Sequence, residues 1–115
     1  MTALDAVNWV DGKQHNVFSL ADKLLWLSQV EAEARALLGR CGKPAAETEM
    51  TADTVLLIPK PYEGIYTHYL EAQMHYANQE YLKFNNAMGL FSALWQEYAN
   101  SLRRGDTGAE RRKFF

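Results

Sequence analysis

The residues best suited to chemistry in this 115-residue chain are His68, Glu71 and His75. Their spacings of three and four residues place all three side chains on one face of a helix. Imidazole and carboxylate groups can ligate zinc or iron, but a di-iron bundle needs carboxylates on several helices and a second Glu–His pair, which the sequence lacks. We interpret the three residues as a solvated helix face and expect no metal and no other cofactor. A metal-dependent bundle enzyme stays an alternative that bound iron or zinc would reveal.

Nucleophilic catalysis has no better support. Cys41 is expected in a loop, without the strand–turn–helix context that activates a nucleophile. A phosphate-binding loop is also excluded, because Gly39 and Gly42 are followed by Lys43 and Pro44, which cannot open the required helix. The sequence therefore predicts no catalytic residues and no enzyme activity.

Aromatic residues are dense in the second half of the chain. Surfaces that stack on nucleic-acid bases interleave such rings with Lys and Arg, but Lys83 is the only basic residue between Tyr62 and Tyr98. We therefore expect the rings to fill the core or a contact between subunits, since tyrosines bury a large area with few rotatable bonds. The residues that we assign to a subunit interface are Tyr62, Tyr66, Tyr69, Tyr81 and Trp95.

The C-terminal stretch is the second candidate for a binding role. It holds the basic residues Arg103, Arg104, Arg111, Arg112 and Lys113. Only Asp106 and Glu110 oppose them, so residues 1–102 contain seven basic and twelve acidic residues. A basic segment that ends in Phe114 and Phe115 combines an electrostatic guide with an apolar anchor, and it can become ordered on a partner. The alternative is a frayed, solubilising terminus.

Composition limits the class of protein. The length suits one domain, and 48% hydrophobic residues are enough for a core. A net charge of −2 gives no general reason to expect nucleic-acid binding. The single Cys41 excludes an internal disulfide, and the chain shows neither a signal-peptide pattern nor an apolar run of membrane-spanning length. We expect an intracellular protein without membrane contact.

The first half of the chain reads as two helices followed by an extended segment. A short helix is expected over 3–10, ended by Asp11-Gly12. A second helix should begin after Ser19, with Asp22 completing a capping box, and should end at Gly39. Residues 54–58 could form an edge strand, but the chain offers no second strand. A packed, extended linker is therefore the favoured interpretation.

The second half predicts either one long helix or a helical hairpin. A helix is expected from Pro61, and large apolar residues then alternate at spacings of four and three. These residues are Ala77, Tyr81, Phe84, Met88, Phe91, Trp95, Tyr98 and Leu102. A hairpin would turn near Asn78 or Asn85-Asn86, and Gly105 would cap the last helix. The predicted fold is an all-α bundle of three to four helices over 1–104, with a flexible basic and aromatic tail over 105–115.

Two stretches resemble a family of small phage and prophage proteins. Residues 16–33 resemble the opening N-x-F-x-x-x-x-K-x-x-W-L-x-E-x-E of that family. Residues 59–88 resemble its signature P-x-P-Y-x-x-x-Y-x-x-Y-L-x-A-Q-x-x-x-A-N-x-E-x-x-x-Y-N-N, which fixes polar as well as apolar positions. These proteins are similar to the head–tail connector proteins of tailed bacteriophages, also called adaptor or head-completion proteins.

The resemblance implies a position in the phage neck. Connector proteins are helical bundles that form a ring, commonly of twelve copies, beneath the portal protein and join it to the stopper or tail-terminator protein. Their C-terminal segment often docks on the portal. Carried over by position and chemistry, the implied portal-binding residues are Arg103, Arg104, Arg111, Arg112, Lys113, Phe114 and Phe115.

We therefore expect a structural virion protein that is assembled in the cytoplasm of the host bacterium. DNA would pass through the lumen of the ring without specific binding, and a net-acidic body favours this passage because it repels phosphate. Glu31, Glu33 and Glu47 are candidates for the lumen by charge alone. The alternative is a helical assembly factor, such as a tail-completion or scaffolding chaperone, that is absent from the mature particle.

Overall fold

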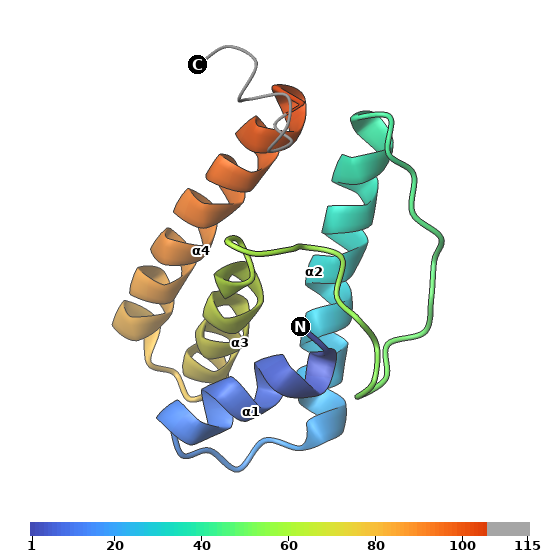
Figure 1. Cartoon of the computed structure of the whole chain (residues 1–115). Coiled ribbons are helices and arrows are strands. Elements are labelled where there is room, and N and C mark those ends of the chain that lie inside the picture. The colour runs from blue at the N-terminus through green and yellow to red at the C-terminus, as the bar shows by residue number, and fades with distance from the viewer. Residues whose placement is uncertain (106–115) are drawn as a thin grey trace.

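The chain folds as a bundle of helices. A computed structural model describes residues 1–105, which form α1 (Ala3–Lys13), α2 (Leu20–Arg40), α3 (Gly64–Ala77) and α4 (Tyr81–Arg103). The pair α3 and α4 forms an antiparallel hairpin, α2 lies on the other side of α3, and α1 crosses the base of the bundle (Figure 1). This arrangement confirms the all-α prediction. Among residues 1–105, no helix is both long and apolar enough to cross a membrane.

The second half of the chain is two helices, as one of the two alternatives predicted. α3 ends at Ala77, and the chain turns near Asn78 before α4 begins. Gln79 has a left-handed backbone with a φ of 61°, which ends the helical path. The turn is closed by the Glu80 N–H, which donates to the carbonyl oxygen of His75 at 2.8 Å.

The ends of α1 and α2 lie beyond the predicted positions. α1 continues through Asp11 and Gly12, where Lys23 Nζ lies 2.8 Å from Asp11 Oδ1. α2 continues through Gly39 because Gly42 takes the left-handed conformation instead, with a φ of 76°. The N–H groups of Gly42 and Lys43 then donate to the carbonyl oxygens of Gly39 and Leu38, a Schellman motif. Both predicted ends were wrong because the structure tolerates a single glycine inside each helix.

The start of α3 is also later than predicted. Pro61 belongs to a turn in which the Tyr62 N–H donates to the Pro59 carbonyl oxygen at 2.9 Å, and the helix begins at Gly64. The start of α2 matches the prediction in its cap, since Ser19 Oγ accepts from the Asp22 N–H at 3.1 Å; of the predicted capping box, the described structure shows this Ser19 half. At the start of α1, Thr2 and Asp5 form a reciprocal capping box.

Residues 54–58 form the packed, extended linker that the sequence favoured. The linker runs beside the N-terminus: the Ala3 N–H donates to Thr54 O at 2.9 Å and the Leu56 N–H donates to Met1 O at 3.0 Å. The side chains of Leu56 and Ile58 are buried. The linker therefore forms part of the core and joins α2 to the hairpin.

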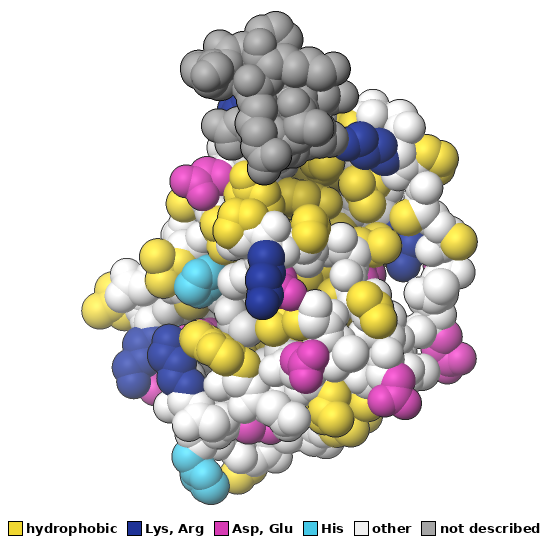
Figure 2. Space-filling model, viewed as in Figure 1, with side chains coloured by type: hydrophobic (Ala, Val, Ile, Leu, Met, Phe, Trp, Pro, Cys, Tyr) yellow, Lys and Arg dark blue, Asp and Glu magenta, His cyan; other side chains and the backbone are white. Residues whose placement is uncertain are grey.

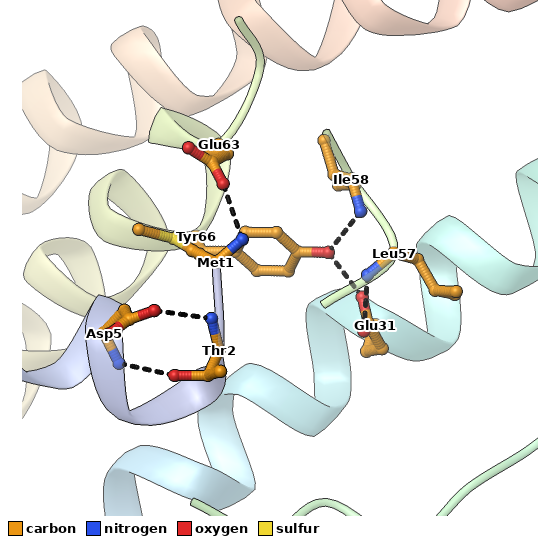
Figure 3. A network of polar contacts seen from close by, with 8 residues as sticks. All are labelled: Met1, Thr2, Asp5, Glu31, Leu57, Ile58, Glu63 and Tyr66. Carbon is orange, nitrogen blue, oxygen red and sulfur yellow. Dashed lines mark hydrogen bonds and ion pairs between the residues drawn. The ribbon is translucent and has the colours of Figure 1, made fainter. Parts of the chain in front are cut away.

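A buried carboxylate fixes this linker against two helices. Glu31 of α2 is only 2% exposed, and its two oxygens accept from the Leu57 N–H at 2.9 Å and from the Tyr66 hydroxyl of α3 (Figure 3). The Tyr66 hydroxyl also accepts from the Ile58 N–H at 2.9 Å. Burial, together with the neighbouring Glu31, raises the pKa of Tyr66 and keeps its hydroxyl a donor. We call this set of contacts the Glu31 network.

Removing one hydroxyl should test how much the Glu31 network contributes. The Tyr66→Phe variant is expected to lose about 2–3 kcal/mol of unfolding free energy, because a buried N–H and a carboxylate oxygen lose their partner. Urea denaturation followed by circular dichroism measures the loss. The matched control is Tyr69→Phe, whose hydroxyl makes an exposed contact with Gln29, and it should lose less than about 1 kcal/mol. Equal losses in the two variants would contradict a special role for the network.

Candidate functional site

Basic residues gather at one end of the bundle. α2 and α4 both end there (Figure 1), and their last turns carry Arg40 and Arg103. Lys43 and Arg104 follow directly, and all four residues are exposed. Cations are favoured at this position because the C-terminus of a helix carries a partial negative charge. We call these four residues the basic end.

The geometry of the basic end is set by the end of α4. Arg103 Nη1 lies 3.4 Å from Asn100 Oδ1, within the last turn of the helix. The Arg104 N–H donates to the Asn100 carbonyl oxygen at 3.0 Å, and Gly105 has a φ of 66°. The predicted cap at Gly105 is thus confirmed, and the Arg103 side chain is held at the helix end.

A belt of aromatic rings lies between α3 and α4 and approaches the basic end. We define the aromatic belt as Tyr62, Tyr69, Phe91, Trp95 and Tyr98. Neighbouring ring centroids are 5.4 Å apart for Tyr62–Tyr98 and Tyr69–Phe91, 6.0 Å for Phe91–Trp95 and 6.1 Å for Trp95–Tyr98. Tyr98 is buried and the other four rings are half-buried. Hydrophobic side chains accordingly gather between the upper parts of α2 and α4 (Figure 2).

The periodicity of α4 explains this belt. Residues spaced by four and three lie on one face of the helix, and this face packs on α3. Tyr69 extends the contact to α2, because its hydroxyl donates to Gln29 Oε1 at 2.7 Å. Burial raises the pKa of Tyr69 and of Tyr98, so both hydroxyls stay neutral at physiological pH. The belt offers packing and hydrogen bonds, not acid–base chemistry.

The structure separates the five residues that were assigned to a subunit interface. Tyr62, Tyr69 and Trp95 belong to the belt and keep partly exposed rings. Tyr66 corrects the expectation, because it is 0% exposed and its hydroxyl is used inside the monomer by the Glu31 network. Tyr81 lies at the opposite end of α4, 55% exposed, and contacts the Tyr76 ring.

Two residues of the predicted portal-binding set, Arg103 and Arg104, form part of the basic end. Arg111, Arg112, Lys113, Phe114 and Phe115 lie outside the described residues. The prediction of lumen-facing carboxylates needs one correction, because the buried Glu31 cannot face a channel. Glu33 and Glu47 are exposed. Sequence reasoning missed the burial of Glu31 because a glutamate on a helix ordinarily faces water.

The residues with metal-binding potential have separate partners. His75 Nδ1 lies 3.1 Å from Glu80 Oε1, and Glu71 Oε1 lies 3.7 Å from Lys13 Nζ. Burial lowers the pKa of His68. Within residues 1–105, no three His, Cys, Asp or Glu side chains come close enough together to hold a metal ion. Cys41 caps α2, where its N–H donates to the Leu37 carbonyl oxygen at 3.1 Å.

Comparison with protein-family models, with curated proteins and with solved structures gives no match to this chain. A functional assignment therefore depends on the basic end, the aromatic belt and the two sequence stretches described above.

The aromatic belt should matter for stability in proportion to its burial. The Trp95→Ala variant is expected to lose about 1.5–2.5 kcal/mol of unfolding free energy, roughly half of what a fully buried tryptophan contributes. The matched control on the same helix is Leu90→Ala, whose side chain is 57% exposed and should change stability by less than about 0.5 kcal/mol. Chemical denaturation at low protein concentration measures both. A loss below about 0.5 kcal/mol for Trp95→Ala would mean that the belt does not hold α4 on α3.

Proposed function

We propose that this chain is a structural protein of the neck of a tailed bacteriophage. It forms a ring between the portal protein and the stopper or tail-terminator protein, and its basic end docks on the portal. The resemblance of residues 16–33 and 59–88 to connector proteins supports the class of protein. These two stretches cover most of α2, the turn before α3, all of α3 and the first turns of α4. The proposed role requires neither catalysis nor a cofactor.

The observation that carries the docking proposal is the concentration of arginines and aromatic rings at one end of the bundle. Arg103 lies two helical turns beyond Trp95, and Arg40 lies at the same end. Arginine and aromatic side chains are the residues most enriched in the energetically important parts of protein interfaces. An acidic protein surface with apolar pockets is the partner that this end would select.

The charge of the remaining surface supports a role around DNA without binding it. Outside the basic end, residues 1–102 contain twelve acidic and five basic residues, and Glu33, Glu47, Glu49 and Asp53 are all exposed. A ring with such walls would repel phosphate groups and let DNA pass through the lumen. The proposed ring would be assembled in the host cytoplasm and would remain in the virion as part of its neck.

The direct test mixes the purified chain with the portal ring of the same phage and images the product by electron microscopy. The full-length chain should add a ring to the outward end of the portal, and a form truncated after Leu102 should not. A ring that survives truncation would overturn the docking role of the C-terminal segment and keep the adaptor function. If neither form binds, the adaptor assignment is contradicted, and a non-virion assembly factor becomes the better description.

Charge reversal refines the same test in the full-length chain. The double variant Arg103→Glu, Arg104→Glu should weaken portal binding by about tenfold or more at low salt, because opposite charges guide and hold the contact. The matched control, Lys13→Glu with Lys60→Glu, makes the same change in net charge at exposed residues away from the basic end and should bind normally. Equal weakening by both variants would show that net charge alone, and not the basic end, drives docking.

A further inference from the structure

The outward face of α4 lacks the charges that a solvated helix usually carries. Residues 84–96 contain no Asp, Glu, Lys or Arg. Opposite the aromatic belt, Leu82 is 77% exposed and Leu90 is 57% exposed. We call this face the α4 ridge; it consists of Leu82, Asn86, Gly89, Leu90 and Ala93, all of them exposed. Exposed apolar surface of this kind is typical of a protein contact.

Gly89 on this ridge makes no close packing contact within residues 1–105. A glycine inside a helix costs about 1 kcal/mol relative to alanine. A Cβ atom at Gly89 would meet nothing within 4 Å, whereas one at Gly64 would lie 3.1 Å from Leu94 Cδ2. Packing between α3 and α4 thus explains Gly64, but nothing in the described part of the chain explains Gly89. Close approach of another backbone to α4 would explain it.

A groove with matching character runs along the outward face of α2. An open hollow of about 370 Å³ is lined by Ala21, Leu24, Leu25, Ser28 and Met50. Leu25 is 59% exposed within it. A second hollow, of about 260 Å³, continues along α2 past Ala32 to Arg35. We call the two hollows together the α2 groove.

The ridge and the groove lie on opposite sides of the molecule. α4 packs on α3, so its ridge faces away from the bundle, and the loop that borders the α2 groove lies at the other edge (Figure 1). Two complementary surfaces on opposite sides of one chain favour a head-to-tail contact, which closes into a ring when the rotation between copies allows it. The two helices also run in the same direction, so a rotation about an axis along them would place α4 of one copy parallel to α2 of the next.

Charges at the two ends of these surfaces are complementary in this parallel arrangement. Leu82 and Ala21 begin the two faces, which sets Lys83 level with Asp22 and Glu97 one residue, about 1.5 Å, beyond Arg35. Arg35 is the most informative of these residues. Its Nε atom is buried and has no hydrogen-bond partner among the described residues. The Arg35 residue as a whole is only half-buried, so a carboxylate of a second copy can reach its guanidinium group, and Glu97 is exposed.

We infer that the α4 ridge of one copy packs into the α2 groove of a second copy of this chain, with Glu97 pairing with Arg35. The contact deepens the ring proposed above by naming the surfaces that join its subunits. Gly89 lets the two helices approach closely, and Leu90 enters the hollow beside Ser28. The basic end lies outside this contact.

Cysteine cross-linking tests the contact in the full chain. In a Cys41→Ser background, the double variant Leu90→Cys, Ser28→Cys should give a ladder of disulfide-linked multimers at high protein concentration. Either single variant should give no ladder. The control Leu90→Cys with Val55→Cys places the second thiol on an exposed residue outside the groove and should not form one. A ladder in the control but not in the ridge–groove pair would overturn the inference, as would the absence of any ladder up to millimolar concentration.

A charge swap tests the register independently. Glu97→Arg and Arg35→Glu should each weaken self-association by about tenfold, measured by sedimentation, and the double swap should recover most of the loss. No recovery would overturn the Glu97–Arg35 pairing. Portal binding of the same variants separates the two proposals. Ladder formation without portal binding would refute the neck function alone, and portal binding without a ladder would refute this contact alone.

Discussion

The buried carboxylate of Glu31 is the constraint on which the arrangement of the bundle depends. A carboxylate inside a core is tolerated only when its oxygens are satisfied, and here a backbone N–H of the linker and the hydroxyl of Tyr66 satisfy them. These contacts join α2, the linker and α3 at one point. They hold α3 in the middle of the molecule, where it contacts both α2 and α4. α4 packs on α3 at the edge of the bundle, and the outward face of α4 is therefore left exposed.

The sequence predicted the elements of the fold much better than their contacts. The helical class, the Ser19 cap, the packed linker, the turn near Asn78 and the cap at Gly105 all follow from local rules of backbone geometry. The ends of α1 and α2 did not follow from these rules. A single glycine destabilises a helix by only about 1 kcal/mol, which the surrounding tertiary contacts can offset. The place of Glu31 could not be predicted either. Its partners, Leu57 and Tyr66, are 26 and 35 residues away along the chain.

For the functional residues too, the sequence predicted the helix faces but not the contacts that these faces make. Periodicity identified the aromatic face of α4, but it could not say what covers that face, and most of the coverage comes from α3 in the same chain. Tyr66 was assigned to a subunit interface for this reason and is instead buried. The outward face of α4 was not predicted as a contact surface, because it contains few large residues. The feature of the sequence that indicates it is the lack of charged residues from 84 to 96.

The proposed contacts use different parts of the bundle, which suits a protein that must assemble in two directions. The basic end is directed along the helices and would meet the portal, while the α4 ridge and the α2 groove face sideways and would meet neighbouring copies. Because these surfaces do not overlap, ring closure and portal docking can occur independently.

The central claim is that the chain is a permanent part of the phage neck, and its abundance in purified particles tests that claim most directly. Quantitative mass spectrometry of mature virions would count the chain relative to the portal protein. The account predicts a fixed number of copies per portal ring in every preparation. Absence of the chain from mature virions, together with its presence in assembling cells, would contradict the account and indicate a transient assembly factor.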